Sequence, residues 1–129
     1  MIQQAITDLI KKIKSQDRKA IANAITLVES KKREDRKTAE LLLNQLSKSN
    51  NKSIRIAISG PPGAGKSTFI EALGFEILKE NRNIAVLAID PTSSLTGGSI
   101  LGDKTRMEKL SRNENAFIRP SPSGMNLGG

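Results

Sequence analysis

A glycine-rich segment at residues 60–67 constrains the fold of this 129-residue chain more than any other feature. It reads Gly-Pro-Pro-Gly-Ala-Gly-Lys-Ser and satisfies the pattern G-x-x-x-x-G-K-[S/T] completely. The preceding run, residues 54–59, is rich in β-branched side chains and predicts a buried strand, while a helical pattern of apolar residues begins at Lys66. Strand, loop and helix in this order are the context in which such a segment wraps a polyphosphate. The segment therefore predicts a nucleotide-binding loop.

The residue types in this segment suit a dense anion. A loop that surrounds phosphates must aim backbone N–H groups inward, and glycine lacks the Cβ that would obstruct them. Lys66 can place its ammonium beside the β- and γ-phosphates and act as the catalytic residue, and the Ser67 hydroxyl can bind Mg²⁺. The expected nucleotide-binding residues are Gly60, Pro61, Pro62, Gly63, Ala64, Gly65, Lys66, Ser67 and Thr68.

A second apolar run, residues 84–89, predicts a strand that is covered on both faces and ends at Asp90. Open α/β sheets bind ligands at the carboxyl ends of their strands, so Asp90 is a candidate contact to Mg²⁺ or its water shell. The alternative is that Asp90 only starts a turn with Pro91. A long loop, a short helix at 104–111 and a third strand at 116–118 follow. This order predicts an α/β fold with a parallel sheet.

In the first third of the chain the apolar residues recur with helical spacing throughout. The spacing of its apolar residues predicts about three amphipathic helices in residues 1–50, with Asp17 and Asp35 as N-caps of the second and third. Residues 47–53 lack periodicity and read as a linker. The pattern leaves open whether this region is a packing module or a partner-binding arm. The apolar faces are expected to carry Ile2, Ile6, Leu9 and Ile13, then Ala20, Ile21, Ala24, Ile25 and Val28, then Ala39, Leu42, Leu43 and Leu46.

Composition excludes several classes of protein. Cysteine and histidine are absent, which excludes a disulfide scaffold, a Cys nucleophile, a Ser-His-Asp triad and a zinc site built on Cys or His ligands. Tyr and Trp are absent too, so base-stacking on aromatic side chains is disfavoured and no nucleic-acid partner is expected.

No run approaches the ~20 apolar residues of a membrane span, and the start of the chain lacks a leader pattern, so we expect a cytoplasmic location without membrane contact.

The net charge of +8 is placed unevenly. Residues 1–53 hold 12 Lys and Arg against 6 Asp and Glu, whereas residues 54–129 hold 9 against 7. The basic part could meet an acidic surface, although solvated helix faces account for the same composition.

Three segments carry a resemblance to a known family. The P-loop residues 60–68, the strand that ends Ala-Ile-Asp-Pro at 88–91, and the run Gly-Gly-Ser-Ile-Leu-Gly-Asp-Lys-Thr-Arg-Met at 97–107 together resemble the MeaB/ArgK family of P-loop GTPases. The run at 97–107 is more distinctive than the P-loop itself. Segments 116–121, 17–18 and 24–29 are also similar to the family, so the resemblance covers nearly the whole chain.

The resemblance implies a three-layer αβα P-loop domain preceded by a helical region. It implies a GTPase that binds GTP, GDP and Mg²⁺, assists adenosylcobalamin loading and protects methylmalonyl-CoA mutase or a related mutase, and forms a homodimer at full length. Older descriptions of the family imply instead an ATP-dependent kinase or ATPase of lysine/arginine/ornithine transport. By this likeness the metal contacts are Ser67, Asp90 and Asp103, and switch I contains Gly97, Gly98, Asp103, Thr105 and Arg106.

The resemblance also implies elements that the sequence lacks. No D-x-x-G of switch II and no N-K-x-D guanine-reading motif is present. We therefore expect residues 54–129 to be the N-terminal part of a P-loop domain, truncated before switch II, with an incomplete sheet. A non-catalytic nucleotide-binding fragment remains an alternative, and a preference for guanine over adenine rests on the resemblance alone.

Overall fold

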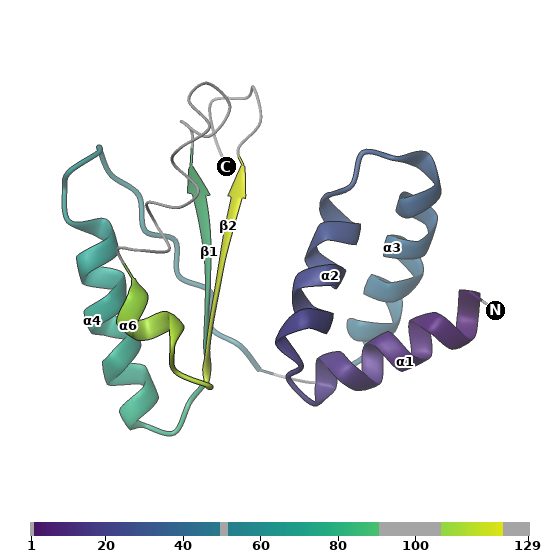
Figure 1. Cartoon of the computed structure of the whole chain (residues 1–129), viewed down its shortest axis with the longest axis horizontal. Helices are drawn as coiled ribbons and strands as arrows, with labels where there is room; N and C mark the ends of the chain where they lie inside the picture. The colour runs from purple at the N-terminus through teal and green to yellow at the C-terminus, as the bar shows by residue number, and fades with distance from the viewer. Residues whose placement is uncertain (1, 50–51, 91–106, 123–129) are drawn as a thin grey trace. The chain divides into compact units, whose positions relative to one another are not determined.

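The computed structural model describes residues 2–49, 52–90 and 107–122. The chain divides into two compact units, residues 1–55 and residues 56–129. Figure 1 shows the elements of each unit. The first unit consists of helices, and the second holds helices and a parallel sheet. None of the helices in the described ranges is both long enough and apolar enough to cross a membrane.

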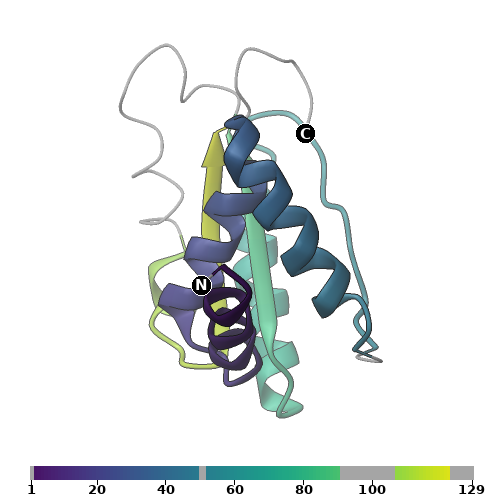
Figure 2. The same cartoon turned by 90° about the vertical axis from the view of Figure 1, so that its right-hand side faces the viewer.

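The first unit is built from three helices, α1 (Ile2–Lys14), α2 (Arg18–Glu29) and α3 (Arg33–Leu46). Figure 2 shows α1 nearly end-on. The Asp17 side chain accepts a hydrogen bond from the backbone N–H of Ala20 at 2.8 Å, which confirms Asp17 as the N-cap of α2. The three apolar stripes meet in a small core formed by Ile6, Ile10, Ala24 and Leu42.

Four expectations for this unit are wrong. Asp35 is not an N-cap, because α3 already begins at Arg33. Its carboxylate lies in the first turn and accepts a hydrogen bond from the Ser30 hydroxyl instead. Three side chains flank the apolar stripes rather than enter the core, namely Ile2, Leu43 and Val28, which are 64%, 48% and 44% exposed. A unit of three short helices has a narrow interior, and only the residues at the centre of each stripe reach it.

The second unit contains α4 (Lys66–Lys79), β1 (Ile84–Asp90), α6 (Glu108–Ser111) and β2 (Ala116–Pro122). The two strands pair in parallel, with Ile84 opposite Ala116 and Asp90 opposite Pro122. The predicted parallel α/β arrangement is confirmed. The helical start at Lys66 and the strand end at Asp90 are also as predicted, whereas the last strand is longer than expected.

Both helices of this unit cover the same face of the sheet. The core between these helices and the sheet is formed by four buried residues, Val86, Met107, Leu110 and Ala116. Around them pack Ile70, Phe75, Leu78, Ile84 and Ile118. Gly74 allows α4 to approach α6 closely, because a Cβ at this position would lie 2.7 Å from Cδ2 of Leu110. A glycine inside a helix costs about 1 kcal/mol in helix propensity, and the close packing of the fully buried Leu110 explains why it is found here.

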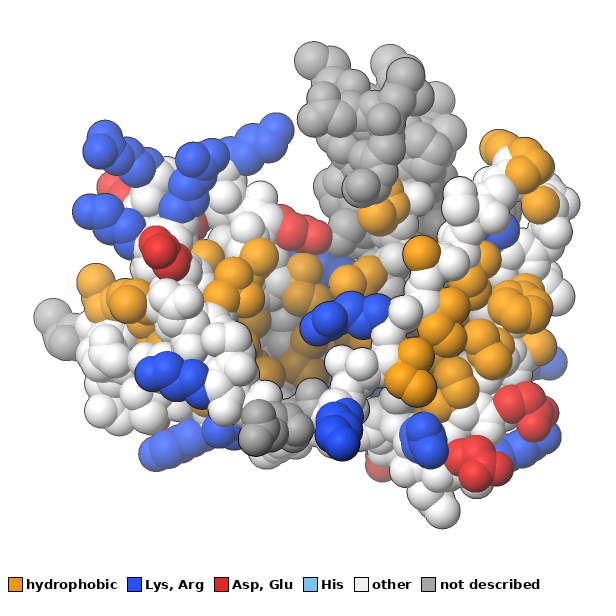
Figure 3. All heavy atoms as spheres, turned by 180° about the vertical axis from the view of Figure 1, so that it is seen from behind, with side chains coloured by type: hydrophobic (Ala, Val, Ile, Leu, Met, Phe, Trp, Pro, Cys, Tyr) orange, Lys and Arg blue, Asp and Glu red, His pale blue; other side chains and the backbone are white. Residues whose placement is uncertain are grey.

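The expected strand at residues 54–59 does not form. These residues are not in a strand, and Ile54 and Ile56 are 82% and 63% exposed. β1 is covered on one face only, since Leu87 and Ile89 are 61% and 51% exposed. Phe69, placed on the apolar face of α4 by its spacing, is 57% exposed. A parallel strand is buried only between neighbouring strands and two helical layers, which the described residues do not provide. Figure 3 shows apolar side chains at the surface of this unit.

Adjacent leucines on α3 test the core of the first unit. We expect Leu42→Ala to lower the free energy of unfolding by about 2–5 kcal/mol, because Leu42 is fully buried and its loss leaves a cavity. The matched change Leu43→Ala, at a side chain that is 48% exposed, should cost under about 1 kcal/mol. Urea titration followed by far-ultraviolet circular dichroism measures both. Equal losses for the two variants would contradict this core.

Candidate functional site

The glycine-rich loop forms a tight turn that leads directly into α4. Gly63 and Gly65 have φ angles of +78° and +88°, in the left-handed region that L-residues other than glycine rarely adopt. The backbone N–H of Ala64 donates to the carbonyl of Pro61 at 3.3 Å and closes the turn. Gly65 is the N-cap of α4, so the chain passes from the loop into the helix without an intervening residue.

The Lys66 side chain bridges this loop. Its Nζ donates to the carbonyl oxygens of Gly60 and Pro61, each at 2.8 Å, and so joins the first residue of α4 to the start of the loop. These bonds hold the ammonium beside the backbone of the turn. Since an ammonium has three N–H donors, two carbonyl partners leave one donor for an added anion.

The N-terminus of α4 supplies backbone donors beside this ammonium. The first intrahelical hydrogen bond runs from the N–H of Phe69 to the carbonyl of Gly65 at 2.9 Å. The N–H groups of Lys66, Ser67 and Thr68 therefore have no acceptor within the helix, and the helix dipole favours an anion at this end. The Ser67 side chain is half-buried here, whereas Thr68 is exposed. Backbone amides, a cation and a hydroxyl thus converge on one helix end, which suits an anionic ligand.

Sheet topology places Asp90 at the same edge as this helix end. Asp90 is the last residue of β1, and α4 precedes β1 and runs in the opposite direction, as Figure 1 shows. The carboxyl end of β1 and the start of α4 thus lie on one side of the unit. The remaining predicted residues, Gly97, Gly98, Asp103, Thr105 and Arg106, lie outside the described residues.

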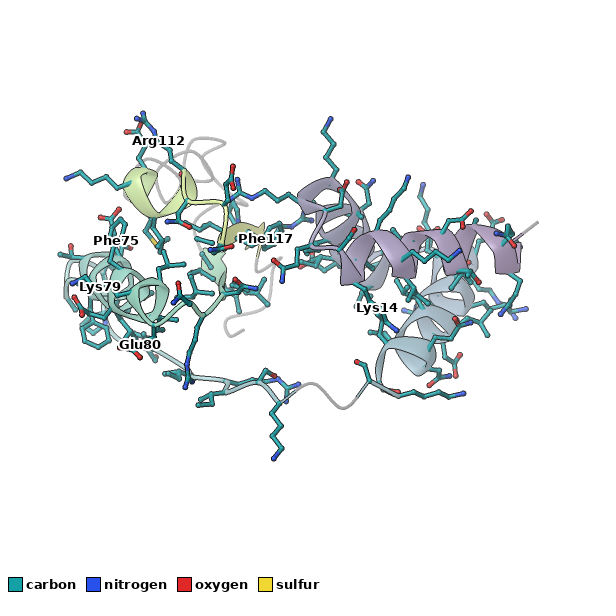
Figure 4. The ribbon with its side chains drawn as sticks, turned by 90° about the horizontal axis from the view of Figure 1, so that it is seen from below. Lys14, Phe75, Lys79, Glu80, Arg112 and Phe117 are labelled. Carbon is teal, nitrogen blue, oxygen red and sulfur yellow. The ribbon has the colours of Figure 1, made fainter. Side chains whose placement is uncertain are left out.

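Acidic groups do not gather elsewhere in the described part of the chain. Within residues 2–49, 52–90 and 107–122, no cluster of three or more carboxylates could hold a metal ion. Lys79 near the end of α4 and Arg112 after α6, both labelled in Figure 4, pair with Glu76 and Glu108 of their own helical segments. Lys66 differs from these surface cations, because its partners are backbone carbonyls of the loop.

One residue of α4 escaped the sequence interpretation. Glu71 lies just beyond the first turn of α4, and its Oε1 accepts a hydrogen bond from the backbone N–H of Leu110 at 3.3 Å. Periodicity could not reveal this contact, since it joins positions 39 residues apart. The only local signal was Gly74, a glycine inside a strong helical pattern, which often marks a close approach.

Comparison with known proteins finds relatives that are described as GTPases. The family model described as "Methylmalonyl Co-A mutase-associated GTPase MeaB" matches residues 21–129. A Caulobacter vibrioides protein is 56% identical over 113 residues, covering 88% of this chain and 35% of that protein. GTPase ArgK of Escherichia coli is 45% identical over 130 residues, covering 100% of this chain and 39% of that protein. The mouse protein named "Methylmalonic aciduria type A homolog, mitochondrial" is 47% identical over 122 residues, covering 87% of this chain and 29% of that protein.

A solved structure supports the same placement. The protein described as "Crystal structure of LAO/AO transport system kinase" superposes with a TM-score of 0.74 and 34% identity, covering 95% of this chain and 35% of that one. The described helices and two-stranded sheet thus match part of that solved structure. The chain spans about a third of the length of the relatives that it matches. With a family match over residues 21–129 and this agreement in fold, the chain belongs to the MeaB/ArgK family.

Proposed function

We propose that this chain binds GTP and GDP through residues 60–68 and, as part of a longer GTPase, supports hydrolysis of GTP. One observation carries the proposal: Lys66 bridges a loop with two left-handed glycines at the point where α4 exposes its first N–H groups. The family name and the GTPase name of the Escherichia coli relative support guanine as the base.

The residues of the loop have distinct roles in this proposal. The backbone N–H groups of Lys66, Ser67 and Thr68 bind phosphate oxygens at the helix N-terminus. Gly60, Pro61, Pro62, Gly63, Ala64 and Gly65 form the wall of the loop, where a side chain would obstruct the phosphates. The third N–H of the Lys66 ammonium meets the β- and γ-phosphates and stabilises the negative charge that develops on the transferring phosphoryl group.

The residues also fit a magnesium ion. Mg²⁺ prefers oxygen ligands and usually takes one or two from the protein, with the rest from nucleotide phosphates and water. The half-buried Ser67 hydroxyl at the start of α4 meets that requirement, and Asp90 and Asp103 are the proposed contacts to the ion or its waters. When bound, the ion would neutralise charge on the β- and γ-phosphates. Gly97, Gly98, Thr105 and Arg106 are proposed to complete switch I.

The biological role that we propose is assistance to a cobalamin-dependent mutase. The longer protein would use GTP to gate adenosylcobalamin loading and to protect methylmalonyl-CoA mutase or a related mutase, acting as a homodimer. The family description names that mutase, which supports this role. Residues 1–50 are then a helical region that precedes a P-loop part at 54–129. The solved structure's description favours one alternative, an ATP-dependent kinase or ATPase linked to lysine/arginine/ornithine transport.

Removal of the Lys66 ammonium tests the loop. We expect Lys66→Ala to weaken the binding of GDP·Mg²⁺ about 10–100-fold, because hydrogen bonds to a charged group contribute about 1.5–3 kcal/mol. Isothermal titration calorimetry measures the affinity. The control is Lys79→Ala on the same helix, which removes an exposed pair to Glu76 and should leave the affinity unchanged. Equal affinities for Lys66→Ala and the unmodified chain would remove the basis of the proposal.

Nucleotide competition separates the two candidate activities. For the longer GTPase, in which a guanine-reading motif would be present, we expect GTP and GDP to displace a fluorescent guanine nucleotide at least about tenfold more effectively than ATP and ADP, a difference of about 1.4 kcal/mol. Fluorescence anisotropy with each competitor in excess Mg²⁺ measures this ratio. Stronger displacement by ATP would favour the kinase or transport ATPase over the GTPase.

The mutase role predicts a complex whose affinity depends on the nucleotide. We expect a purified methylmalonyl-CoA mutase to bind the chain with affinities that differ about 5-fold or more between GDP and a non-hydrolysable GTP analogue, as coupling of 1–3 kcal/mol implies. Biolayer interferometry measures both affinities, and Lys66→Ala should abolish the difference between them. Absence of a complex with either nucleotide would argue against a mutase-binding role for this part of the protein.

A further inference from the structure

The short helix α6 lacks a cap of its own. Its N-cap residue, Met107, offers no side-chain hydrogen bond, and the first intrahelical bond runs from the N–H of Ser111 to the carbonyl of Met107 at 2.9 Å. The N–H of Leu110 therefore has no acceptor within α6. In most helices a Ser, Thr, Asp or Asn at the N-cap meets this need.

The missing acceptor comes from α4. Oε1 of Glu71 accepts from the N–H of Leu110 at 3.3 Å, and the Leu110 side chain packs against Gly74 one turn further along α4. Leu110 is fully buried and Met107 is 1% exposed, so this end of α6 is embedded in the core of its unit. A polar contact and a packing contact thus fix α6 to the helix that begins at the phosphate loop.

We propose that Glu71 is a positioning residue that couples the phosphate loop to α6, so that nucleotide binding at residues 60–68 also stabilises the N-terminal turn of α6. The nucleotide dependence in this inference rests on the proposed function. The acceptor for Leu110 is in place only while the first two turns of α4 are folded, because Glu71 projects from them. A ligand that stabilises the start of α4 therefore lowers the population in which the Glu71–Leu110 bond is open.

The coupling is reciprocal. If a nucleotide strengthens the attachment of α6, then loss of that attachment must weaken nucleotide binding by the same factor. This reciprocal effect distinguishes a coupling residue from a residue that only supports the fold. Substitution of a residue that only supports the fold would change stability but would not change how the nucleotide affects α6. Glu71→Gln provides the conservative variant, because its amide oxygen can still accept from Leu110.

Amide hydrogen exchange of the nucleotide-free chain, read at Leu110 by NMR, tests the attachment. We expect the Leu110 amide to exchange about 3–10-fold faster in Glu71→Ala than in the unmodified chain, and at an unchanged rate in Glu71→Gln. The control is Glu76→Ala on the same helix, whose carboxylate is exposed and pairs with Lys79, and this variant should leave the Leu110 rate unchanged. An unchanged rate in Glu71→Ala would overturn the attachment.

The same measurement with saturating GDP·Mg²⁺ tests the coupling, with calorimetry in parallel. We expect GDP·Mg²⁺ to slow exchange at Leu110 at least threefold in the unmodified chain and in Glu71→Gln, and to leave the rate in Glu71→Ala unchanged. Binding heat without slowing at Leu110, or equal slowing in Glu71→Ala, would overturn the coupling while the proposed function stands. Absence of binding heat in the unmodified chain would overturn the proposed function and the coupling together, and the nucleotide-free rates would still decide the attachment.

Discussion

The left-handed turn at Gly65 is the constraint on which the candidate site depends. With φ at +88°, Gly65 ends the loop and caps α4 at once, so that Lys66 becomes the first helical residue. From that position its side chain can reach back to the carbonyls of Gly60 and Pro61. A residue with a Cβ would be strained in this conformation by roughly 1–2 kcal/mol. The loop, the ammonium and the helix end are therefore held together by two left-handed glycines, Gly63 and Gly65, and by three hydrogen bonds.

The position of the loop in the unit follows from the packing of α4. Ile70, Phe75 and Leu78 attach the helix to the sheet face that Val86 and Ala116 also line. Gly74 lets the buried Leu110 approach α4, and Glu71 supplies the acceptor that α6 lacks. Contacts on one side of α4 thus set where its N-terminus presents the loop, at the edge where β1 ends.

The face of the sheet that α4 and α6 do not cover carries exposed apolar side chains. Leu87 and Ile89 of β1 are more than half exposed, as are Ile54 and Ile56 in the run before the loop. Each of these side chains belongs to a run that is apolar in sequence, and apolar runs of this kind are buried only when strands pair on both sides and helices cover both faces. The chain covers about a third of its relatives' length.

The sequence by itself determined the features that depend on neighbouring residues. The glycine spacing and the helical pattern after it predicted the loop and the start of α4 at Lys66. The apolar run at 84–89 predicted the end of β1 at Asp90, and all of these features depend on neighbouring residues. The cap at Asp17 was predictable for the same reason. The tertiary structure alone decided that Leu42 is buried while Leu43 is exposed, that residues 54–59 do not pair, and that Glu71 meets Leu110. These outcomes depend on the number of neighbouring elements and on contacts between distant residues, which the period of a sequence does not encode.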